Sequence, residues 1–344
     1  MELQKDLKQA VLWEPAQGKK VRCKLCNWRC LIDEGRIGRC AVRKNIEGVL
    51  YSLNYYKVCS TNVDPIEKKP MYHFQPGSRS FSIATMGCNF QCEFCQNWQI
   101  SQAAIEDGTI NGESVTPEQI VQGAVRTGCK SIAYTYTEPT VFMELCNDCG
   151  PLAKQKGLKN VFVSNGYMTT EAIDFARGWL DGINVDLKAF SEDYYKRLCK
   201  ARLQPVLDTI KYIARQTKIW IEITTLLVPG ENDSEDELKR LAEFLVSEGG
   251  PDVPWHVSRF YPQYKYLDSE PTPLKSLDLA YEIGKAAGLN YVYLGNVPGT
   301  KSENTFCYKC GRLLIERIGY RIAANHVKAS QCPDCGAQIA GVDL

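Results

Sequence analysis

The stretch "MGCNFQCEFCQNW", residues 86–98, determines how the rest of the chain is interpreted. It contains Cys88, Cys92 and Cys95, with three residues in the first gap and two in the second. The apolar run 81–86 precedes it, so the three thiols follow the end of a predicted strand. A closed structural metal site usually has four protein ligands, whereas three ligands leave one coordination position for a substrate or cofactor. The spacing therefore predicts a catalytic metal centre.

Iron is the metal that this arrangement favours. In a [4Fe-4S] cluster each thiolate normally binds one iron, so three thiolates leave one iron without a protein ligand. A zinc site with three cysteines would need a fourth ligand, and His73 is the only nearby histidine. A Cys3His zinc site and unliganded core thiols are the alternatives to a cluster.

From about residue 80 the chain alternates short β-rich runs with amphipathic helical patterns. The predicted strands are 81–86, 131–139, 160–166, 182–190, 218–230 and 255–262, with a seventh short run, 291–296, to close one edge. Strands separated by helices form parallel sheets through right-handed crossovers. The pattern predicts an α/β fold, either a partial TIM-like barrel or a doubly wound sheet.

Polar side chains lie near the C-terminal ends of several predicted strands. They are Thr137, Glu138, Asn165, Asp186 and Lys188. Parallel α/β folds bind their ligands at that end of the strands. Because these residues come from several strands, they favour a partial (β/α)6 barrel over the open sheet.

The composition excludes several classes of function. The chain has 344 residues, 41 basic and 40 acidic side chains, and a net charge of +1, which gives no strong signal for nucleic acid or an anionic membrane. The charged N-terminal segment lacks the apolar region of a signal peptide, and no apolar run is long enough for a membrane span. We therefore expect a cytoplasmic protein, in which 16 cysteines bind metal more often than they form disulfides.

Two knuckles near the C-terminus, "CYKCG" and "CPDCG", contain Cys307, Cys310, Cys332 and Cys335. Glycine permits a positive φ, so backbone N–H groups in a knuckle can turn toward the sulfurs. Two knuckles joined by the hairpin-like stretch 312–323 are typical of a zinc ribbon with four thiolate ligands. A rubredoxin-like iron or an auxiliary cluster is the alternative.

A third cysteine group lies near the N-terminus in "CKLCNWRCLIDEGRIGRC" and comprises Cys23, Cys26, Cys30 and Cys40. Zinc and an auxiliary [4Fe-4S] cluster both suit four clustered thiols, and unliganded thiols are the remaining alternative. We divide the chain into an N-terminal cysteine-rich segment (1–79), a central barrel (80–300) and a C-terminal zinc-ribbon-like module (301–344).

The sequence "CNFQCEFC" resembles the C-x3-C-x2-C signature of radical S-adenosylmethionine (SAM) enzymes. In that family the amino and carboxylate groups of SAM occupy the fourth iron of a [4Fe-4S] cluster. An aromatic residue precedes the last cysteine, and Phe94 would pack on the adenine. The resemblance implies reductive cleavage of SAM to a 5'-deoxyadenosyl radical that abstracts hydrogen from a substrate. A one-electron donor of the ferredoxin or flavodoxin type would be a partner.

Two later motifs extend the resemblance. "YTYTEP" is similar to the second-strand SAM motif of glycyl-radical-enzyme activases, which implies that Glu138 and the Thr137 backbone hold the methionyl ammonium. "VSNG" is similar to the third-strand motif and implies a contact of Asn165 with the SAM carboxylate or ribose.

The fourth and sixth strands carry two more motifs. "VDLKAF" implies that Asp186 binds ribose hydroxyls and that Lys188 binds a carboxylate. "WHVSRF" supplies His256, at the place of a histidine that contacts SAM in activases.

Residues 64–101 and the flanking cysteine pattern resemble the radical SAM component of the AmmeMemoRadiSam system. The likeness covers the chain from about Val21 onward, and it implies partner proteins of that system and an unidentified substrate. A glycyl-radical-enzyme activase of the pyruvate formate-lyase type is the alternative, although "TYTEP" replaces the double-glycine form of the activase motif. A zinc-ribbon binding protein or an iron–sulfur electron carrier without catalysis is the alternative of another class.

Overall fold

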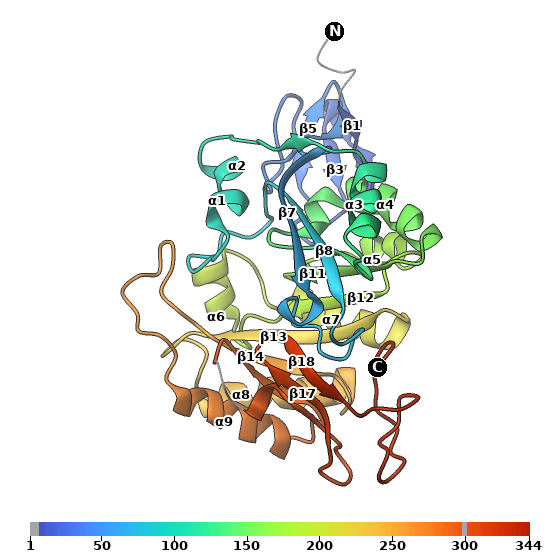
Figure 1. Cartoon of the computed structure of the whole chain (residues 1–344). Helices are drawn as coiled ribbons and strands as arrows, with labels where there is room; N and C mark the ends of the chain where they lie inside the picture. Colours follow the sequence, from blue (N-terminus) through green and yellow to red (C-terminus); the bar gives the residue numbers. More distant parts are fainter. Residues whose placement is uncertain (1–6, 298–300) are drawn as a thin grey trace.

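The chain is built on one large central sheet, with a cysteine-rich part at each end of it (Figure 1). The computed structural model describes residues 7–297 and 301–344. In Figure 1 the N-terminal part lies at the top and the C-terminal part at the bottom, so the two terminal cysteine groups are far apart.

Parallel strands make up most of the central sheet. Its seven parallel strands in the described ranges are β8 (Arg79–Thr85), β10 (Ser131–Tyr134), β11 (Lys159–Ser164), β12 (Gly182–Asp186), β13 (Trp220–Leu227), β14 (Trp255–Arg259) and β15 (Val292–Gly295). Each lies within or overlaps a run predicted from the sequence, and β15 forms one edge. The predicted α/β fold with a mostly parallel sheet is confirmed, while the count of six barrel units stays a prediction.

Helices connect the parallel strands and pack against the sheet. The longer ones are α3 (Pro117–Arg126), α4 (Met143–Gln155), α5 (Thr170–Ala176), α7 (Gln204–Gln216), α8 (Glu235–Gly249) and α9 (Leu274–Ala286). In α7, Val206, Ile210 and Ile213 recur at helical spacing and are buried. Helix α8 begins with three acidic residues, where the helix dipole favours negative charge.

Shorter helical turns lie in the loops. They are η2 (Gln17–Lys19), η3 (Ile66–Lys68), α1 (Trp98–Ser101), α2 (Ala103–Glu106), η4 (Pro139–Phe142), α6 (Glu192–Tyr194), the π-helix η5 (Tyr195–Cys199) and η6 (Lys301–Glu303).

Strand β7 (Lys57–Pro65) extends the sheet beyond β8, and the sequence pattern does not predict it. It pairs antiparallel with β8, and the short strand β9 (Glu113–Ser114) pairs with its other edge. Asp64 lies on β7 and is buried, where it accepts hydrogen bonds from Lys69 (2.6 Å) and Ser82 (2.8 Å). Most of the other residues of β7 are exposed or half-buried, so it lacks the apolar alternation that marks a strand in a sequence. The division of the chain at residue 79 stays a prediction, but the sheet crosses it.

Two small sheets form the N-terminal part: β1 (Lys8–Gln9), β6 (Val49–Ser52) and β5 (Arg43–Ile46); and β2 (Trp13–Pro15), β3 (Val21–Cys23) and β4 (Leu31–Ile32). A buried ion pair between Arg43 and Glu144 attaches this part to α4, and the two side chains are only 2% and 0% exposed. Glu144 also accepts a hydrogen bond from the Val11 N–H at 2.7 Å. Breaking such a pair leaves an unpaired buried charge, at a cost of about 3–5 kcal/mol.

The C-terminal part is a three-stranded antiparallel sheet of β16 (Thr305–Phe306), β17 (Leu313–Ile318) and β18 (Arg321–Asn325). The predicted hairpin at 312–323 is therefore present as β17 and β18. Buried Arg317 attaches this sheet to the rest of the chain, because it donates hydrogen bonds to Tyr72 O (2.8 Å) and Thr305 Oγ1 (2.8 Å). Its guanidinium also lies 4.3 Å from the centre of the Tyr72 ring.

The last residues of the chain are held by the segment before β8. The Val342 N–H donates to His73 O (2.8 Å), and the Gln75 N–H donates to Val342 O (2.8 Å). The His73 ring bonds to Ala340 O through Nδ1 (2.7 Å) and to the Tyr293 hydroxyl through Nε2 (2.6 Å). Residues 72–75 therefore connect the C-terminal tail, residues 340–344, to Tyr293 of the central sheet.

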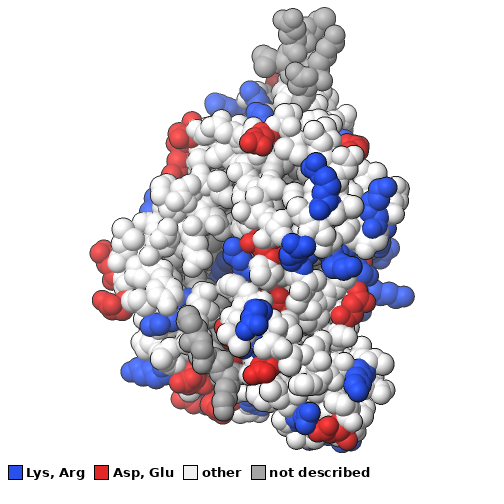
Figure 2. Space-filling model, viewed as in Figure 1, with Lys and Arg blue, Asp and Glu red and all other residues white. Residues whose placement is uncertain are grey.

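The charged side chains are mixed over the face in Figure 2, which agrees with a net charge of +1. None of the helices in the described ranges has the length and apolar character needed to cross a membrane.

Candidate active site

The cysteine loop begins directly after β8 and is pressed against the N-terminal part. Gly87 has a φ of +107°, in the region that favours glycine. A Cβ at this position would lie 2.6 Å from Val42 Cγ1 and 3.2 Å from Cys40 O. Both the backbone conformation and the close approach therefore require glycine before the first cysteine of the loop.

Distant parts of the chain fix the path of the loop. The Gln91 N–H donates to Cys199 O (3.1 Å) at the end of η5, and Trp28 Nε1 donates to Asn89 O (2.8 Å). The Cys95 sulfur lies 3.2 Å from Ser101 Oγ in α1. The loop is thus held from several sides.

Cys88, Cys92 and Cys95 line a cavity of about 460 Å³ at the C-terminal end of the parallel strands. Six of the other predicted site residues line the same cavity: Phe94, Thr137, Glu138, Asn165, Asp186 and Lys188. Phe94 is buried and packs against Tyr194, with ring centroids 5.9 Å apart. The structure therefore brings these nine residues together, and their roles in binding stay predictions.

Glu138 is a buried carboxylate at the start of η4, in the cavity wall. Its Oε1 accepts hydrogen bonds from the Thr140 N–H (3.0 Å), the Thr140 hydroxyl and the Ser164 hydroxyl (2.8 Å). Its Oε2 accepts one from the Asn165 N–H (2.8 Å). Burial raises the pKa of this carboxyl above its usual value, although the hydrogen bonds oppose the change. These donors fix the orientation of the carboxylate.

Thr137 and Asn165 are both tied to the loop or its strand. The Thr137 hydroxyl donates to Thr85 O at the end of β8 (2.8 Å). Asn165 Nδ2 donates to Asn89 Oδ1 (2.7 Å) and lies 3.8 Å from the Cys88 sulfur. Asn165 therefore links the end of β11 to the cysteine loop.

Asp186 and Lys188 form an ion pair of 2.6 Å at the end of β12. Burial alone would lower the pKa of Lys188, but Asp186 and the Cys92 thiol raise it above its usual value. The ammonium therefore stays charged at neutral pH. The pair offers a polar ligand one acceptor and one donor side by side.

The pKa values of the three loop thiols shift in different directions. Burial raises the pKa of Cys88 and of Cys95 above the usual value. A hydrogen bond from Cys199 and the nearby charge of Lys188 lower the pKa of Cys92 despite its burial. Because metal ligands must be deprotonated, metal binding here would release protons from Cys88 and Cys95.

His256 lies in the wall of a second cavity, of about 470 Å³, and is not among the described residues that line the first. Its Nε2 bonds to Glu222 Oε2 (2.7 Å), and its ring packs against Tyr72 and Tyr293. Burial alone would raise the pKa of Glu222, but the hydrogen bond with His256 brings it below the usual value. His256 therefore lines the second cavity, and its contact with SAM stays a prediction.

His73 cannot serve as the fourth ligand of a Cys3His site in this arrangement. Both of its ring nitrogens are engaged, by Ala340 and by Tyr293, and burial lowers the pKa of His73 to about 4. The zinc alternative for the cysteine loop is therefore not formed in the described structure.

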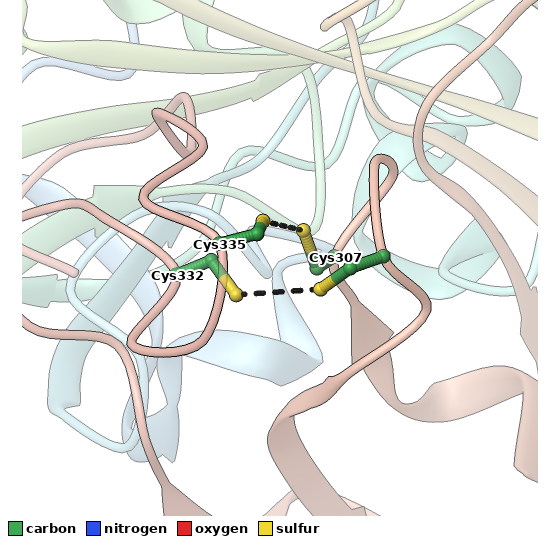
Figure 3. Close-up of side chains that lie close together, drawn as sticks. Cys307, Cys332 and Cys335 are labelled. Atoms are coloured by element: carbon green, nitrogen blue, oxygen red, sulfur yellow. Dashed lines mark hydrogen bonds between the residues drawn. The ribbon is translucent and has the colours of Figure 1, made fainter.

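The C-terminal cysteines lie close enough together to share one metal ion (Figure 3). The sulfurs of Cys307 and Cys335 are 3.6 Å apart, those of Cys310 and Cys332 are 3.7 Å apart, and all four lie within 4.8 Å of one another. The glycine after each knuckle has a positive φ, +75° and +70°, as predicted. This group could bind a metal.

The N-terminal cysteines also converge. Cys23, Cys26, Cys30 and Cys40 line one small cavity at the other end of the molecule.

Two contacts at the cysteine loop were not evident from the sequence. Cys199 lies outside the three cysteine groups of the sequence, but it is buried and interacts with Cys92. Trp28 and Asn89 position the loop through a bond that joins residues 61 apart in sequence. No local spacing signals such a contact, because it depends on how the N-terminal part packs on the barrel.

Residues 82–245 match the model of the Radical SAM superfamily. The uncharacterized protein MJ0808 of Methanocaldococcus jannaschii is 44% identical over 335 residues, which cover 97% of this chain and 99% of that protein. The pyruvate formate-lyase 1-activating enzyme of Escherichia coli K12 is 25% identical over 197 residues, 53% of this chain and 75% of that enzyme. A radical SAM methyltransferase from Sphaerobacter thermophilus has a TM-score of 0.50 at 14% identity, covering 64% of this chain and 67% of that one. This last likeness concerns the fold alone.

Proposed function

Because this chain belongs to the radical SAM superfamily, we propose that it is an enzyme that cleaves SAM reductively and abstracts hydrogen from a substrate. The observation that carries the proposal is the cavity into which three thiols of one loop and the polar ends of several parallel strands converge. The family implies a [4Fe-4S] cluster and SAM as cofactors.

Cys88, Cys92 and Cys95 would hold the cluster. Thiolates are the ligands that iron–sulfur clusters take, and three of them from one loop leave one iron for the amino and carboxylate groups of SAM. When bound, the cluster and SAM supply the one-electron cleavage of a carbon–sulfur bond that yields a 5'-deoxyadenosyl radical. Phe94, buried in the same wall, would offer its ring to the adenine.

The chain's own side chains would orient SAM. Glu138, fixed by its hydrogen-bond donors, supplies negative charge for the methionyl ammonium, together with the Thr137 backbone. Asp186 can accept hydrogen bonds from ribose hydroxyls, and Lys188 can donate to a carboxylate. Asn165 would have to share its amide with Asn89, so we assign it chiefly to positioning the loop and secondarily to SAM.

We assign the second cavity to the substrate. It shares Ser258, Asn296 and Tyr320 with the cysteine cavity, so the two spaces adjoin. Its walls include His256 and Glu67, which suits a polar substrate. A substrate here would lie beside the SAM site, where the protein shields a reactive radical from water.

The specific role that we propose is the radical SAM component of the AmmeMemoRadiSam system, with partner proteins of that system. The motif stretch 64–101 and the C-terminal cysteine module support this assignment. A glycyl-radical-enzyme activase is the second candidate, favoured by the 25% identity to the Escherichia coli activating enzyme. In either case a ferredoxin- or flavodoxin-type protein would donate the electron.

We propose structural zinc at Cys307, Cys310, Cys332 and Cys335. Four sulfurs at a Zn–S distance of about 2.3 Å around one tetrahedral ion lie roughly 3.8 Å apart. The two measured separations, 3.6 and 3.7 Å, are close to that value.

Anaerobic reconstitution with iron and sulfide, followed by incubation with SAM and dithionite, tests the proposal. We expect methionine and 5'-deoxyadenosine by mass spectrometry, because the radical formed on cleavage becomes 5'-deoxyadenosine when it takes up hydrogen. The triple variant Cys88→Ala, Cys92→Ala, Cys95→Ala should form neither product. Cys59→Ala removes a thiol of β7 that does not line the cavity and should keep full cleavage.

The same preparation separates the alternatives. An electron carrier would bind iron and be reduced without cleaving SAM, and a zinc-ribbon binding protein would contain zinc and no iron. Cleavage that persists in the triple variant would refute the assignment of the three cysteines.

A further inference from the structure

The N-terminal cysteines form a site that the proposed reaction does not use. Cys23 ends β3, while Cys26, Cys30 and Cys40 lie in the loops after it, and all four line one cavity. Most of the other side chains around the cavity are apolar, among them Leu25, Ile32 and Val141. The sequence leaves zinc, an auxiliary [4Fe-4S] cluster and unliganded thiols as alternatives for these residues.

The spacing of the thiols distinguishes the two metals. One zinc ion binds all four sulfurs, so it needs them about 3.8 Å apart. In a cluster each thiolate binds a different iron, so the sulfurs stay further apart. Among the described residues, only the C-terminal cysteines bring three or more ligand atoms within 4.8 Å of one another. The N-terminal thiols therefore share a cavity without the close approach that zinc requires.

The sulfur separations of the three cysteine groups fall into two patterns. The ribbon sulfurs have the separations of a zinc site, and Cys88, Cys92 and Cys95 line a cavity without meeting the same 4.8 Å limit. The N-terminal group matches the second pattern, not the first.

The surroundings also suit a redox centre. Arg43 NH1 donates a hydrogen bond to the Cys23 sulfur at 3.3 Å, from a guanidinium that is almost fully buried. Hydrogen bonds to the ligand sulfurs and burial set the potential of a cluster. Arg43 also forms an ion pair with Glu144 and donates a hydrogen bond to Val11 O (3.1 Å), so its guanidinium is fixed beside Cys23.

We propose that Cys23, Cys26, Cys30 and Cys40 bind a second [4Fe-4S] cluster, closed by four thiolates and able to accept and return one electron. It lies beside the first cysteine loop, because the Cys40 carbonyl is in contact range of Gly87, the residue before Cys88. Trp28 lines this cavity and donates to Asn89 in the other loop. One hydrogen bond and one close backbone approach therefore connect the two cysteine groups.

Metal analysis of the anaerobically reconstituted full chain tests the proposal without using activity. We expect about eight irons and one zinc per chain in the unaltered protein. The variant Cys88→Ala, Cys92→Ala, Cys95→Ala should keep about four irons and the zinc. The variant Cys26→Ala, Cys30→Ala should also keep about four irons and the zinc, whereas Cys307→Ala, Cys310→Ala should lose only zinc.

Electron paramagnetic resonance of the dithionite-reduced loop variant provides the second measurement. We expect the signal of a one-electron-reduced [4Fe-4S] cluster that does not change when SAM is added, since all its irons have thiolate ligands. This variant leaves the N-terminal cysteines intact, so the test does not depend on whether the N-terminal variant folds. Four irons and two zincs in the unaltered protein, or a loop variant free of iron, would overturn the proposal. Failure of SAM cleavage alone would leave this second cluster in place and concern only the proposed reaction.

Discussion

Acidification below pH 6.5 should destabilise the contact between the C-terminal tail and the central sheet, and His73 is the group responsible. In the folded chain burial lowers its pKa from 6.5 to about 4. The unfolded chain binds a proton as the pH falls through 6.5, while the folded chain stays neutral. The stabilisation is therefore complete above pH 6.5 and is lost as the pH falls to about 4.

The size of the effect follows from the same two values. A difference of 2.5 pKa units between 6.5 and about 4 corresponds to about 3 kcal/mol of unfolding free energy. The variant His73→Gln keeps a donor for Ala340 O and an acceptor for the Tyr293 hydroxyl, but it does not titrate. We expect it to lose about 3 kcal/mol less than the unaltered protein over this pH range.

Urea unfolding at a series of pH values between 7.5 and 4 measures the difference. Trp220 reports on the relevant contact, because its ring stacks on His73 with centroids 6.4 Å apart. His326→Gln, which alters an exposed histidine of the ribbon, is the matched control and should follow the unaltered protein. Groups that do not interact with His73 titrate alike in all three proteins, so they cancel in the comparison, whereas Glu222, whose pKa His73 helps to lower, is part of the measured difference. Equal losses in His73→Gln and the unaltered protein would refute the reasoning.

Three further substitutions test other contacts. Gly87→Ala forces a Cβ to within 2.6 Å of Val42 at a positive φ, so we expect the free energy of unfolding to fall by about 2–5 kcal/mol and the iron content to fall. Chemical denaturation and an iron assay measure both, and Gly178→Ala, at a position with open space around it, is the control. Lys188→Met removes the half-buried ammonium of the cavity, which should weaken SAM binding about tenfold or more in an equilibrium binding measurement; unchanged affinity would show that Lys188 does not contact SAM. Arg317→Met removes the hydrogen bonds to Tyr72 and Thr305, so the attachment of the C-terminal part should lose about 3 kcal/mol of stability. We expect a lower melting temperature and faster proteolysis of this part; an unchanged melting temperature would contradict this role.

The alternation of strands and helices from residue 80 onward could be predicted because buried parallel strands are continuous apolar runs and their crossovers are amphipathic. The runs at 182–190 and 218–230 each contain a strand of the sheet. Strand β7 could not be predicted, because most of its residues are exposed or half-buried and only Val58 and Asp64 are buried, so the apolar alternation of a strand is missing.

The candidate site was predictable to the extent that it lies at strand ends. Glu138, Asn165 and Asp186 each follow a separate strand, and the folded sheet places all three in one cavity wall. His256 also lies on the expected strand. Its ring bonds to Glu222 of the neighbouring strand β13 and lines the second cavity. Which face a side chain takes depends on such a partner across the sheet, and a single sequence does not reveal it.

The bond between His73 and Ala340 joins positions that are 267 residues apart, which bears on how the protein is made. At a synthesis rate of about 5–20 residues per second, the ribosome needs roughly 15–50 seconds to reach the second position after the first. By the end of that interval the thiols near residue 90 have long been made, while residues 73–75 still lack their hydrogen bonds to the C-terminal residues. Iron and sulfur can therefore be delivered to these thiols before the bond between His73 and Ala340 forms. A bulky tag fused directly to the last residues would interfere with that bond rather than with the delivery of iron and sulfur.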